Sequence, residues 1–600
     1  MGSVNDGFRI DPQYPIEPSS LPAKWVVAAL GDAVGDIRPG FPSGSHNEDG
    51  IGVPHLRPMN IDRRGRLTLE QLKYVPPASD LRVFRGEVLF NNTNSRELVG
   101  KTAPVDLDGE WAFSNHMTRL HPPPGLSYRF LAYQLHYLWE EGYFRLRCTQ
   151  HVNQASISVR TLARTVPLVL APEREQLRIV AALDENLERL DSAAAVLMAA
   201  LTKLGEFRRG VLRRATSGTL VLTEAELAQA EGREYESGRE LLMRLENEAR
   251  EQWQAQRRSN ETMGVWPRSR HAETAFQPPS TLDFAKLPPL SEGWTWARVK
   301  QVGEVTLGRQ RAPKYHHGTH MRPYLRVANV FEDRIDASDV HEMNFSPEEY
   351  EVYSLRRGDI LLNEGQSPEL VGRPAMFNDE VSGACFQKTL IRFRAHSGVS
   401  ASFALLVFRD YLHTRRFRRE AKWSTNIAHL GADRFANMEF PLPPLAEQER
   451  IVTEAKRCLA ASDDLTEVVQ RVLDRIGHVR HAALKLAFTG SLLPQAEDEQ
   501  PAALLLQRIK LVRQIMRVPE ALRHRGPQIR RGLMQRKPLV QVLADEGGRL
   551  TPEHLLQGSG IGEDLVDDFY AELKREEAAG RIRQESDGDR VHLTLAREGL

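Results

Sequence analysis

The sequence predicts an α+β fold of two mixed, strand-rich domains in a pseudo-two-fold repeat. An antiparallel pair of long coiled-coil helices separates them, and a small winged-helix-like α+β extension follows at the C-terminus. Three observations predict this fold: segments of the first half return about 270 residues later, a long amphipathic helix follows each strand-rich part, and the last hundred residues lie outside the repeat. The 600 residues exceed the roughly 250 to 300 over which a single hydrophobic core grows, so several folded units are expected.

The internal repeat rests on five pairs of matching segments. The first pair is offset by 269 residues and the other four by 272, which indicates the duplication of one unit. The matches are Pro54–Ile61 with Pro323–Val330, Arg85–Asn91 with Arg357–Asn363, Glu97–Lys101 with Glu369–Arg373, Glu175–Val180 with Glu447–Val452, and Gly218–Leu220 with Gly490–Leu492.

Each copy begins with a strand-rich part that opens on a Trp-bearing entry, Leu21–Trp25 or Pro289–Trp296, and continues through short β-branched runs broken by Gly, Pro and Asn. A proline-rich stop then precedes a long helix. The predicted boundaries are 1–166 for the first strand-rich domain, 172–255 for the first long helix and the shorter helix after it, 256–285 for a linker, 286–440 for the second strand-rich domain, 445–515 for the second long helix and its follower, and 516–600 for the C-terminal extension.

The two long helices show apolar residues spaced by threes and fours, the pattern of a coiled-coil seam. Ser462 and Thr466 interrupt the second seam with polar groups. Pairing the two helices with each other in antiparallel orientation would bury both seams. The seam residues are Ile179, Leu183, Leu187, Leu190, Ala194, Leu197, Leu201, Leu204, Phe207 and Val211 in the first helix, and Ile451, Ala455, Leu459, Val469, Leu473, Ile476, Val479 and Ala483 in the second.

The C-terminal extension begins with a basic segment and continues with a pattern of short helices and a hairpin. Between Arg508 and Lys537 there are ten Lys or Arg residues and one acid, Glu520, a composition suited to phosphate binding or to a solvated or partner-binding helix. Residues 538–600 suggest three helices and a hairpin that turns at Asp587 and Gly588, an order that resembles a winged helix.

Composition and charge narrow the class of protein. Eighty basic and eighty acidic side chains cancel, so any DNA-binding surface must be local. Cys148, Cys385 and Cys458 are too far apart for a disulfide framework or a zinc knuckle, which favours a reducing cytoplasm. No signal peptide, lipidation motif or membrane-spanning run is evident.

The second helix begins with the motif Pro-Leu-Pro-Pro-Leu-Ala-Glu-Gln-x-Arg-Ile-Val at residues 441–452, and the first copy departs from it as Pro-Leu-Val-Leu-Ala-Pro-Glu-Arg-Glu-Gln, which reads as two residues longer. A Trp-led domain followed by this helix start, twice in one chain, resembles the specificity subunit of type I restriction-modification systems. The resemblance covers about residues 20 to 510.

The resemblance implies a DNA-recognition subunit with no catalytic centre, cofactor or metal of its own. Each strand-rich part would be a target-recognition domain that reads one half of a bipartite site in double-stranded DNA, and the helices would fix the spacing. The implied partners are two methyltransferase (modification) subunits, which would bind S-adenosylmethionine, and restriction/translocase subunits, which would use ATP and Mg²⁺. No Asn-or-Asp-Pro-Pro-aromatic motif of an adenine methyltransferase occurs in the sequence.

Residues shared by both copies cannot distinguish two different half-sites. They are therefore predicted to serve the framework or to contact phosphates, which position a protein without specifying a sequence. Turn residues that cap their own backbone are an equal alternative for the two asparagines. These candidates are Arg57, Asn60, Lys101, Arg326, Asn329 and Arg373.

Base reading is predicted instead for polar residues that differ between the copies. Asn and Gln can pair with adenine, and Arg or Lys with guanine. A solvated loop is the competing interpretation for each of them. The candidates are Asn92, Thr93 and Asn94 in the first copy, and Arg309, Arg311, Lys314 and Gln366 in the second.

Two other functions remain open at this point. A transcription regulator would use the basic C-terminal part as its DNA reader, and a related bipartite, type II-like system would pair the chain with a fused methylase-nuclease. A self-sufficient nuclease or methyltransferase is disfavoured because its motifs are absent. A phosphate-binding loop at Gly100 is excluded because Ser95 stands where that loop needs a glycine.

Overall fold

The computed structural model describes residues 10–76, 81–152, 154–262, 287–424, 427–516, 537–559, 561, 566–587 and 590–596. The chain divides into two compact units, Met1–Ala194 with Leu473–Leu600, and Ala195–Val472. We call residues 10–171 region 1, which lies in the first unit, and residues 287–444 region 2, which lies in the second. Of the predicted linker, residues 263–285 lie outside the described part of the chain.

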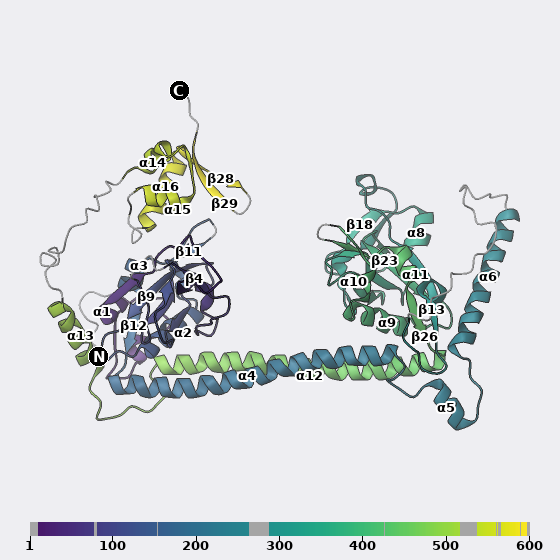
Figure 1. The fold of residues 1–600 in the computed structure, drawn as a ribbon, viewed down its shortest axis with the longest axis horizontal. Helices are drawn as coiled ribbons and strands as arrows, with labels where there is room; N and C mark the ends of the chain where they lie inside the picture. The colour runs from purple at the N-terminus through teal and green to yellow at the C-terminus, as the bar shows by residue number, and fades with distance from the viewer. Residues whose placement is uncertain are drawn as a thin grey trace. The chain divides into compact units, whose positions relative to one another are not determined.

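Region 1 is a mixed α/β body with small sheets in the strand orders β1–β12, β2–β9–β5–β7, β4–β3–β8 and β10–β11–β6 (Figure 1). Strands β3 and β8 are parallel, and the other pairs are antiparallel. Its strands are β1 (Val26–Ala29), β2 (Asp36–Pro39), β3 (Val53–Leu56), β4 (Lys73–Val75), β5 (Val88–Asn91), β6 (Thr93–Asn94), β7 (Thr102–Pro104), β8 (Ala112–Phe113), β9 (Met117–His121), β10 (Thr149–Gln150), β11 (Ala155–Ser156) and β12 (Pro167–Leu170). Its helices are η1 (Pro18–Ser20), α1 (Leu30–Val34), η2 (Pro58–Asn60), α2 (Tyr128–Glu140), η3 (Phe144–Leu146) and α3 (Val159–Thr165).

Region 2 repeats these sheets in the same order: β13–β26, β14–β23–β19–β21, β18–β15–β22 and β20–β25–β24, with a small extra hairpin β16–β17. Its strands are β13 (Thr295–Arg298), β14 (Gly303–Leu307), β15 (Met321–Leu325), β16 (Val330–Phe331), β17 (Arg334–Ile335), β18 (His341–Asn344), β19 (Ile360–Asn363), β20 (Gly365–Gln366), β21 (Pro374–Met376), β22 (Cys385–Phe386), β23 (Leu390–Ala395), β24 (Lys422–Trp423), β25 (Ala428–His429) and β26 (Glu439–Leu442). Its helices are α7 (Val299–Val302), η5 (Pro313–Tyr315), η6 (Val327–Asn329), α8 (Pro347–Tyr353), α9 (Ala401–His413), α10 (Arg416–Glu420) and α11 (Ala432–Asn437).

The shared glycine of the Glu-Leu-Val-Gly segment has a structural reason in both regions. Gly100 and Gly372 have positive φ angles of 98° and 76°, which favour glycine. A Cβ at either position would lie within 2.4 Å of an aromatic ring atom, of Phe144 in region 1 and of Phe417 in region 2. The repeat therefore preserves a close approach of backbone to ring in each core.

In each region the first strand of the repeat pairs with the last one before the long helix. Val26 lies opposite Leu170, and Thr295 lies opposite Leu442. The number of residues from Leu170 to Glu175 is the same as from Leu442 to Glu447, so the first copy has no insertion before its helix. The prediction of a first copy two residues longer is wrong, because it matched Pro167 with Pro441, whereas Pro167 occupies the position of Glu439.

The helices α4 (Glu173–Thr216) and α12 (Leu445–Phe488) have 44 residues each and contact each other in both units (Figure 1). In the first unit, Leu183 of α4 and Leu484 of α12 share one core cluster, and Asp191 pairs with Arg480. Residue numbers rise along α4 as they fall along α12, so the helices run antiparallel. In the second unit, Arg208 pairs with Asp463 in the same sense.

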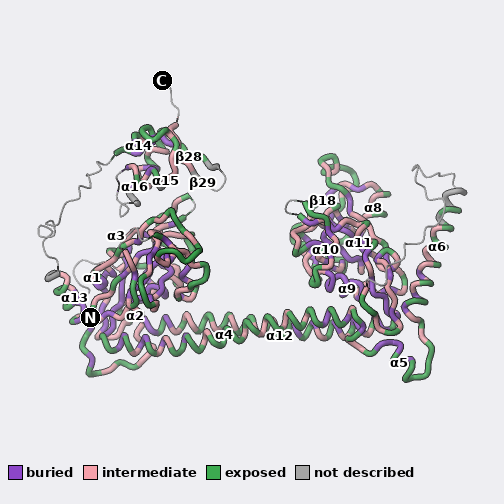
Figure 2. Tube along the Cα trace, in the orientation of Figure 1, coloured by how far each residue is buried: buried purple, intermediate pink, exposed green. Residues whose placement is uncertain are grey.

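The predicted seam fails at two positions. Phe207 is 49% exposed and Val479 46% exposed, and the neighbours Arg208 and Arg480 turn toward the opposite helix instead. A straight α-helix has 3.6 residues per turn, so a strict seven-residue repeat gradually rotates around the helix. Toward the helix ends, positions beside the predicted seam therefore face the partner helix. In Figure 2 the middle of the helix pair is mostly coloured intermediate and exposed, and most of the buried residues lie nearer the helix ends.

Shorter helices follow each long helix and pack on the opposite region. Helices α5 (Glu224–Glu231) and α6 (Gly238–Thr262) belong to the second unit, and Leu241 and Leu245 of α6 join the core of region 2. Helix α13 (Ala502–Met516) places Ala502 and Leu506 in the core of region 1. Helix α6 continues to Thr262, into the segment predicted to be a linker.

The C-terminal extension has its own core around Leu543, Phe569 and Leu593. Its strands form a sheet in the order β27–β29–β28. The predicted turn residue Gly588 and most of the predicted basic segment, residues 517–536, lie outside the described part of the chain. The elements are α14 (Leu539–Asp545), β27 (Arg549–Leu550), α15 (Pro552–Ser559), α16 (Val566–Ala578), β28 (Ile582–Asp587) and β29 (Arg590–Leu595).

Candidate nucleic-acid interface

A buried tryptophan ties each region to the first turn of a long helix. The indole Nε1 of Trp25 donates to Oε2 of Glu175 at 2.9 Å, and that of Trp294 donates to Oε1 of Glu447 at 2.7 Å. Burial raises the pKa of Glu447 above its ordinary value, although hydrogen bonds from the Glu224 N–H and from Trp294 oppose the rise. Two equivalent carboxylates thus hold two equivalent indoles.

The glutamine that follows each glutamate makes a second matched contact. The side-chain carbonyl of Gln176 accepts from the Ser127 N–H at 2.9 Å, and that of Gln448 accepts from the Ser400 N–H at 2.7 Å. These serines cap the helices α2 and α9. The Glu-Gln pair of the repeated motif therefore orients both the entry tryptophan and the main helix of its region.

The asparagines shared by the two copies lie inside the framework. Asn60 is fully buried; its Oδ1 accepts from the Arg57 N–H at 2.9 Å and its Nδ2 donates to the Thr68 carbonyl at 3.0 Å. Asn329 makes the same bonds, to the Arg326 N–H at 3.0 Å and the Asp336 carbonyl at 2.9 Å. Both side-chain amides therefore form their hydrogen bonds with nearby backbone groups.

The shared cations have protein partners as well. Lys101 is buried, and its Nζ donates to the carbonyls of Pro58 and Ile61; burial lowers its pKa below the ordinary value. The guanidinium of Arg373, at the equivalent position, lies 4.8 Å from the ring centre of Phe331.

The arginines beside the two asparagines are half-buried and make local contacts of their own. Arg57 donates to the Gln71 carbonyl at 2.7 Å. Arg326 pairs with Asp339.

Among the candidates of region 1 that differ between the copies, exposure separates Asn92 from its neighbours. Asn92 is buried, and its Nδ2 donates to Thr118 Oγ1 at 2.9 Å while its Oδ1 accepts from Thr93 Oγ1 at 2.8 Å. Thr93 and Asn94 form strand β6 and are half-buried. Asn94 accepts from the Ser95 N–H through its Oδ1 at 2.8 Å, and its Nδ2 has no hydrogen-bond partner among the described residues.

Gln366 of region 2 stands at the same place as Asn94. It lies on β20, the counterpart of β6, and its Oε1 accepts from the Ser367 N–H at 3.0 Å. An amide side chain in the same local geometry therefore recurs at one sheet edge of each region.

Arg309 is separated from the other cationic candidates by its burial. It is 6% exposed, pairs with Glu349 at 2.7 Å and lies 3.6 Å above the Tyr315 ring. Arg311 and Lys314, in the same loop, are exposed. The loop thus presents two cations outward and uses a third to hold itself against the region.

Comparison with known proteins finds relatives for most of this chain. Residues 291–469 match the family model described as "Type I restriction modification DNA specificity domain". The type I restriction enzyme StySPI specificity subunit of Salmonella potsdam is 23% identical over 481 residues, 77% of this chain and 89% of that protein. The EcoKI specificity subunit of Escherichia coli K12 is 24% identical over 201 residues, 32% of this chain and 43% of that protein.

A solved structure supports the fold. A chain from work on complex assembly and conformational transition of the type I R-M system superposes with a TM-score of 0.53 at 18% identity, covering 79% of this chain and 99% of that chain. The chain belongs to the type I restriction-modification specificity subunits. Such a subunit contributes DNA specificity and is itself non-catalytic, as expected from the repeat and the helix-start motif.

The sequence analysis did not identify Trp423, an exposed residue of the specificity subunit on the same small sheet as Gln366. Trp423 on β24 is 55% exposed, and Arg418 lies 5.4 Å from its ring centre. Strand β24 pairs with β25, which pairs with β20. No periodicity marks an exposed tryptophan on a two-residue strand, and only its neighbourhood in the sheet connects it to the site.

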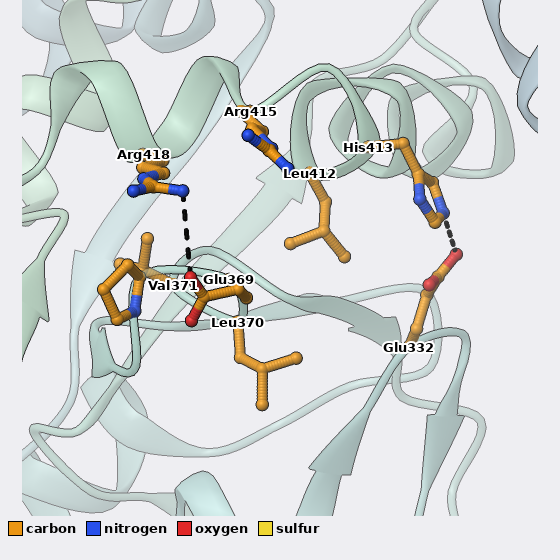
Figure 3. Close-up of a pocket in the computed structure, with 9 residues that line it drawn as sticks. Glu332, Glu369, Leu370, Val371, Leu412, His413, Arg415 and Arg418 are labelled. Atoms are coloured by element: carbon orange, nitrogen blue, oxygen red, sulfur yellow. Dashed lines mark hydrogen bonds and ion pairs between the residues drawn. The ribbon is translucent and has the colours of Figure 1, made fainter. Parts of the chain in front are cut away.

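The specificity subunit also has a small cavity in region 2, with a volume of about 210 Å³ (Figure 3). Two polar contacts lie at its walls: a hydrogen bond between His413 and Glu332 at 2.8 Å, and an ion pair of Arg418 with Glu369 at 3.7 Å. The volume is below the roughly 300 to 1,000 Å³ of small-molecule sites. The cavity is packing space beside α9 and α10.

Two searches complete the description of the subunit. Within the described residues, no group of three or more His, Cys, Asp or Glu side chains is placed to hold a metal ion. Among the helices that the structure describes, none is long and apolar enough to span a bilayer.

Proposed function

We propose that region 1 and region 2 each read one half of a bipartite site in double-stranded DNA, in a subunit without a reaction centre of its own. The observation that carries this proposal is the matched construction of the two regions. Each has the same sheet order and the same Trp–Glu and Gln–Ser contacts, and each is closed by the first turns of one long helix and the last turns of the other. A duplicated reader suits two half-sites.

Within each region, we assign base reading to the edge that carries Asn94 or Gln366, and framework roles to the buried shared residues. Each of these amides keeps a donor and a second acceptor lone pair, as pairing with adenine requires. Asn92 and Arg309, originally base-reading candidates, are proposed to position their loops, since their polar atoms are occupied by protein partners. Thr93 stays a candidate.

We further propose that α4 and α12 fix the spacing of the half-sites and dock two modification subunits. Large apolar side chains on the outer faces of these helices support a docking role: Val196 is 69% exposed and Leu465 53% exposed. The partners would supply S-adenosylmethionine-dependent methylation, and a restriction subunit would supply ATP- and Mg²⁺-dependent translocation. A fused methylase-nuclease partner is the alternative assembly.

The C-terminal extension is proposed to be a winged helix that does not read DNA. The order helix, strand, helix, helix, strand, strand supports the first part, with β27 pairing to the last strand β29. Residues 537–600 contain eight Lys or Arg against fourteen Asp or Glu, and this acidic excess opposes phosphate binding. Truncation after Met516 would keep α13 on region 1 and is expected to leave site-specific methylation intact; its loss would favour the regulator alternative.

The decisive experiment is base-resolution mapping of N6-methyladenine in DNA from cells that express the chain with its modification subunit, compared with cells that express that subunit alone. The expected result is a split motif of two short half-sites around a fixed gap, present only with this chain. Exchange of residues 21–166 for those of a relative should change one half and leave the other. Methylation that is independent of this chain would overturn the proposal.

A further inference from the structure

The loop that joins the four-stranded sheet to the three-stranded sheet begins in the same register in both regions. It comprises residues 40–52 between β2 and β3 and residues 308–320 between β14 and β15, 13 residues in each case. The second loop residue makes an isolated parallel bridge in both, Phe41 with Ser114 and Arg309 with Gln387. The first parts of the two loops can therefore be compared from this bridge onward, and region 2 has one more residue before Tyr324, the equivalent of His55.

The equivalent loops carry opposite charge. Residues 308–320 contain Arg309, Arg311 and Lys314 and no Asp or Glu. Residues 40–52 contain Glu48 and Asp49 and no Lys or Arg. Counted from the bridge at the start of the loop, Ser43 corresponds to Arg311 and His46 to Lys314.

Arg311 and Lys314 are exposed, and no carboxylate within the described residues pairs with either of them. Arg311 donates only to His316 Nε2, at 3.3 Å, and Lys314 lies 4.8 Å from the ring centre of Tyr315. The buried Arg309 guanidinium lies 3.6 Å from the centre of that same ring. The two cations are thus held outward without neutralisation.

A second segment brings another cation to the same place. The Lys388 N–H donates to the Arg309 carbonyl at 2.8 Å, so the turn after β22 lies against the base of the loop. Lys388 is exposed and likewise has no carboxylate partner among the described residues. At the matching turn of region 1 stand Asn115 and His116, neither of them a Lys or Arg. We call Arg311, Lys314 and Lys388 the basic edge.

This turn also connects the basic edge to the amide edge of region 2. The Glu364 N–H donates to the Thr389 carbonyl at 2.9 Å. Thr389 directly follows Lys388, and Glu364 lies two residues before Gln366. Phosphate contacts made here would lie beside the base-reading position.

Region 1 has basic residues in a different loop, but two of them are committed to the long helix. Arg64 and Arg66 pair with Asp191 of α4 at 3.0 and 2.8 Å, and Arg480 of α12 joins the same carboxylate at 3.3 Å. These arginines fasten the loop 62–66 to the helix pair. They do not replace the basic edge.

We propose that the basic edge of region 2 binds DNA phosphate groups, and that the equivalent loop of region 1 does not, so the two half-sites are held unequally. This inference rests on the proposed function. Region 2 supplies salt-dependent phosphate contacts, whereas residues 40–52 contain no Lys or Arg to make such contacts. Each phosphate neutralised by a cation adds about 0.9 to the slope of log Kobs against log salt concentration.

The test measures binding of the full chain with its modification subunit to two duplexes of equal length, one with the mapped site and one scrambled, from 50 to 200 mM NaCl. The variant Arg311→Gln/Lys314→Gln is expected to flatten the salt slope by about 1.8 on both duplexes. Wild type would then lose about 12-fold more affinity than the variant across that fourfold range of salt. Lys388→Gln is expected to flatten the slope by about 0.9.

The matched control is Arg356→Gln/Arg357→Gln, which removes the same charge from exposed positions at another turn of region 2 and should leave the slope unchanged. The charge-preserving variant Arg311→Lys/Lys314→Arg should restore the wild-type slope, which separates phosphate binding from misfolding. A slope unchanged in Arg311→Gln/Lys314→Gln, with preference for the mapped site intact, would overturn this inference and leave the proposed function standing. Equal wild-type affinity for both duplexes, with the slope still dependent on the basic edge, would overturn the proposed function and support the edge.

Discussion

The indole of Trp25 lies in the core of region 1 and donates its Nε1 hydrogen to Glu175, 150 residues later on the first turn of α4. Because Glu175 belongs to the helix and Trp25 to the strand-rich region, this bond joins the two parts directly. The buried carboxylate also accepts from Gln495 Nε2 at 2.5 Å, in the segment that follows α12. A single glutamate therefore joins the region to both long-helix segments that close it.

Trp25→Phe should destabilise the first unit by about 2 to 4 kcal/mol, since it removes a hydrogen bond to a buried carboxylate and part of a large buried side chain. Differential scanning calorimetry of the full chain would measure the shift. Trp296→Phe is the control: Trp296 is half-buried and its Nε1 bonds only the Pro288 carbonyl, so a change below about 1 kcal/mol is expected. Equal losses in both variants would contradict a stabilising role for the Trp25–Glu175 hydrogen bond.

The sequence predicted the organisation of the chain because duplication marks the residues that the fold reuses. The repeated Glu-Gln of the helix starts proved to be the pair that holds Trp25 and Trp294 and the serine caps. The predicted second entry, Pro289–Trp296, contains two tryptophans: Trp296 is half-buried and bonds a loop carbonyl, whereas Trp294 is buried and is the equivalent of Trp25. Strand register, which sequence does not show, decides between them.

The predicted details failed where tertiary contacts override a local pattern. A heptad reading counts apolar residues only, so it chose Phe207 and Val479, whereas the helix pair uses Arg208 with Asp463 and Arg480 with Asp191 at these levels. For the interface, residue type identified Asn92 and Arg309 as suitable for reading bases. Their burial depends on partners distant in sequence, Thr118 and Glu349, which no local pattern reveals.

Acid should destabilise region 1 selectively through His55. Burial lowers the pKa of His55 to about 4, below the ordinary value of 6.5, and its Nδ1 contacts His46 Nε2 at 3.2 Å. Because the unfolded chain takes up this proton near pH 6.5 and the folded chain only near pH 4, stability is full above pH 6.5. It falls by about 3 kcal/mol as the pH drops between these values.

The effect can be localised by hydrogen exchange at β3 and at β15, its counterpart in region 2, where Tyr324 occupies the position of His55. Protection of β3 should fall between pH 6.5 and 4 after correction for the intrinsic exchange rate, and protection of β15 should change less. His55→Tyr, which installs the residue of region 2, should flatten the response of β3. An unaltered response in that variant would assign the acid sensitivity to other groups.

Ser462→Ala should stabilise the second unit by about 1 kcal/mol. Ser462 is 1% exposed on the seam of α12, and its hydroxyl has no hydrogen-bond partner among the described residues. Removing a buried, unsatisfied hydroxyl recovers its desolvation cost, and alanine is the better helix former. Thr466→Ala is the comparison: its hydroxyl donates to the Ser462 carbonyl at 2.8 Å, so no such gain is expected. A lower melting temperature for Ser462→Ala would refute the assignment.

Asn94→Ala and Gln366→Ala should each relax recognition of one half-site and spare the other. The two amides occupy equivalent strands, β6 and β20, and each accepts from the N–H of the following serine, which fixes its plane. An amide that bonds a base in two places contributes about 1 to 3 kcal/mol of discrimination, so the affected half should tolerate substitution at one base pair. Methylation mapping in cells carrying each variant would show which half changes.

Asn92→Ala offers the contrasting case: its amide bonds Thr118 inside region 1, so this change should reduce stability and overall methylation without altering the preferred base. If Asn94→Ala and Asn92→Ala behave alike, the β6 edge belongs to the framework, and base reading in region 1 must be sought elsewhere, for example on β10 at the other edge of the same sheet.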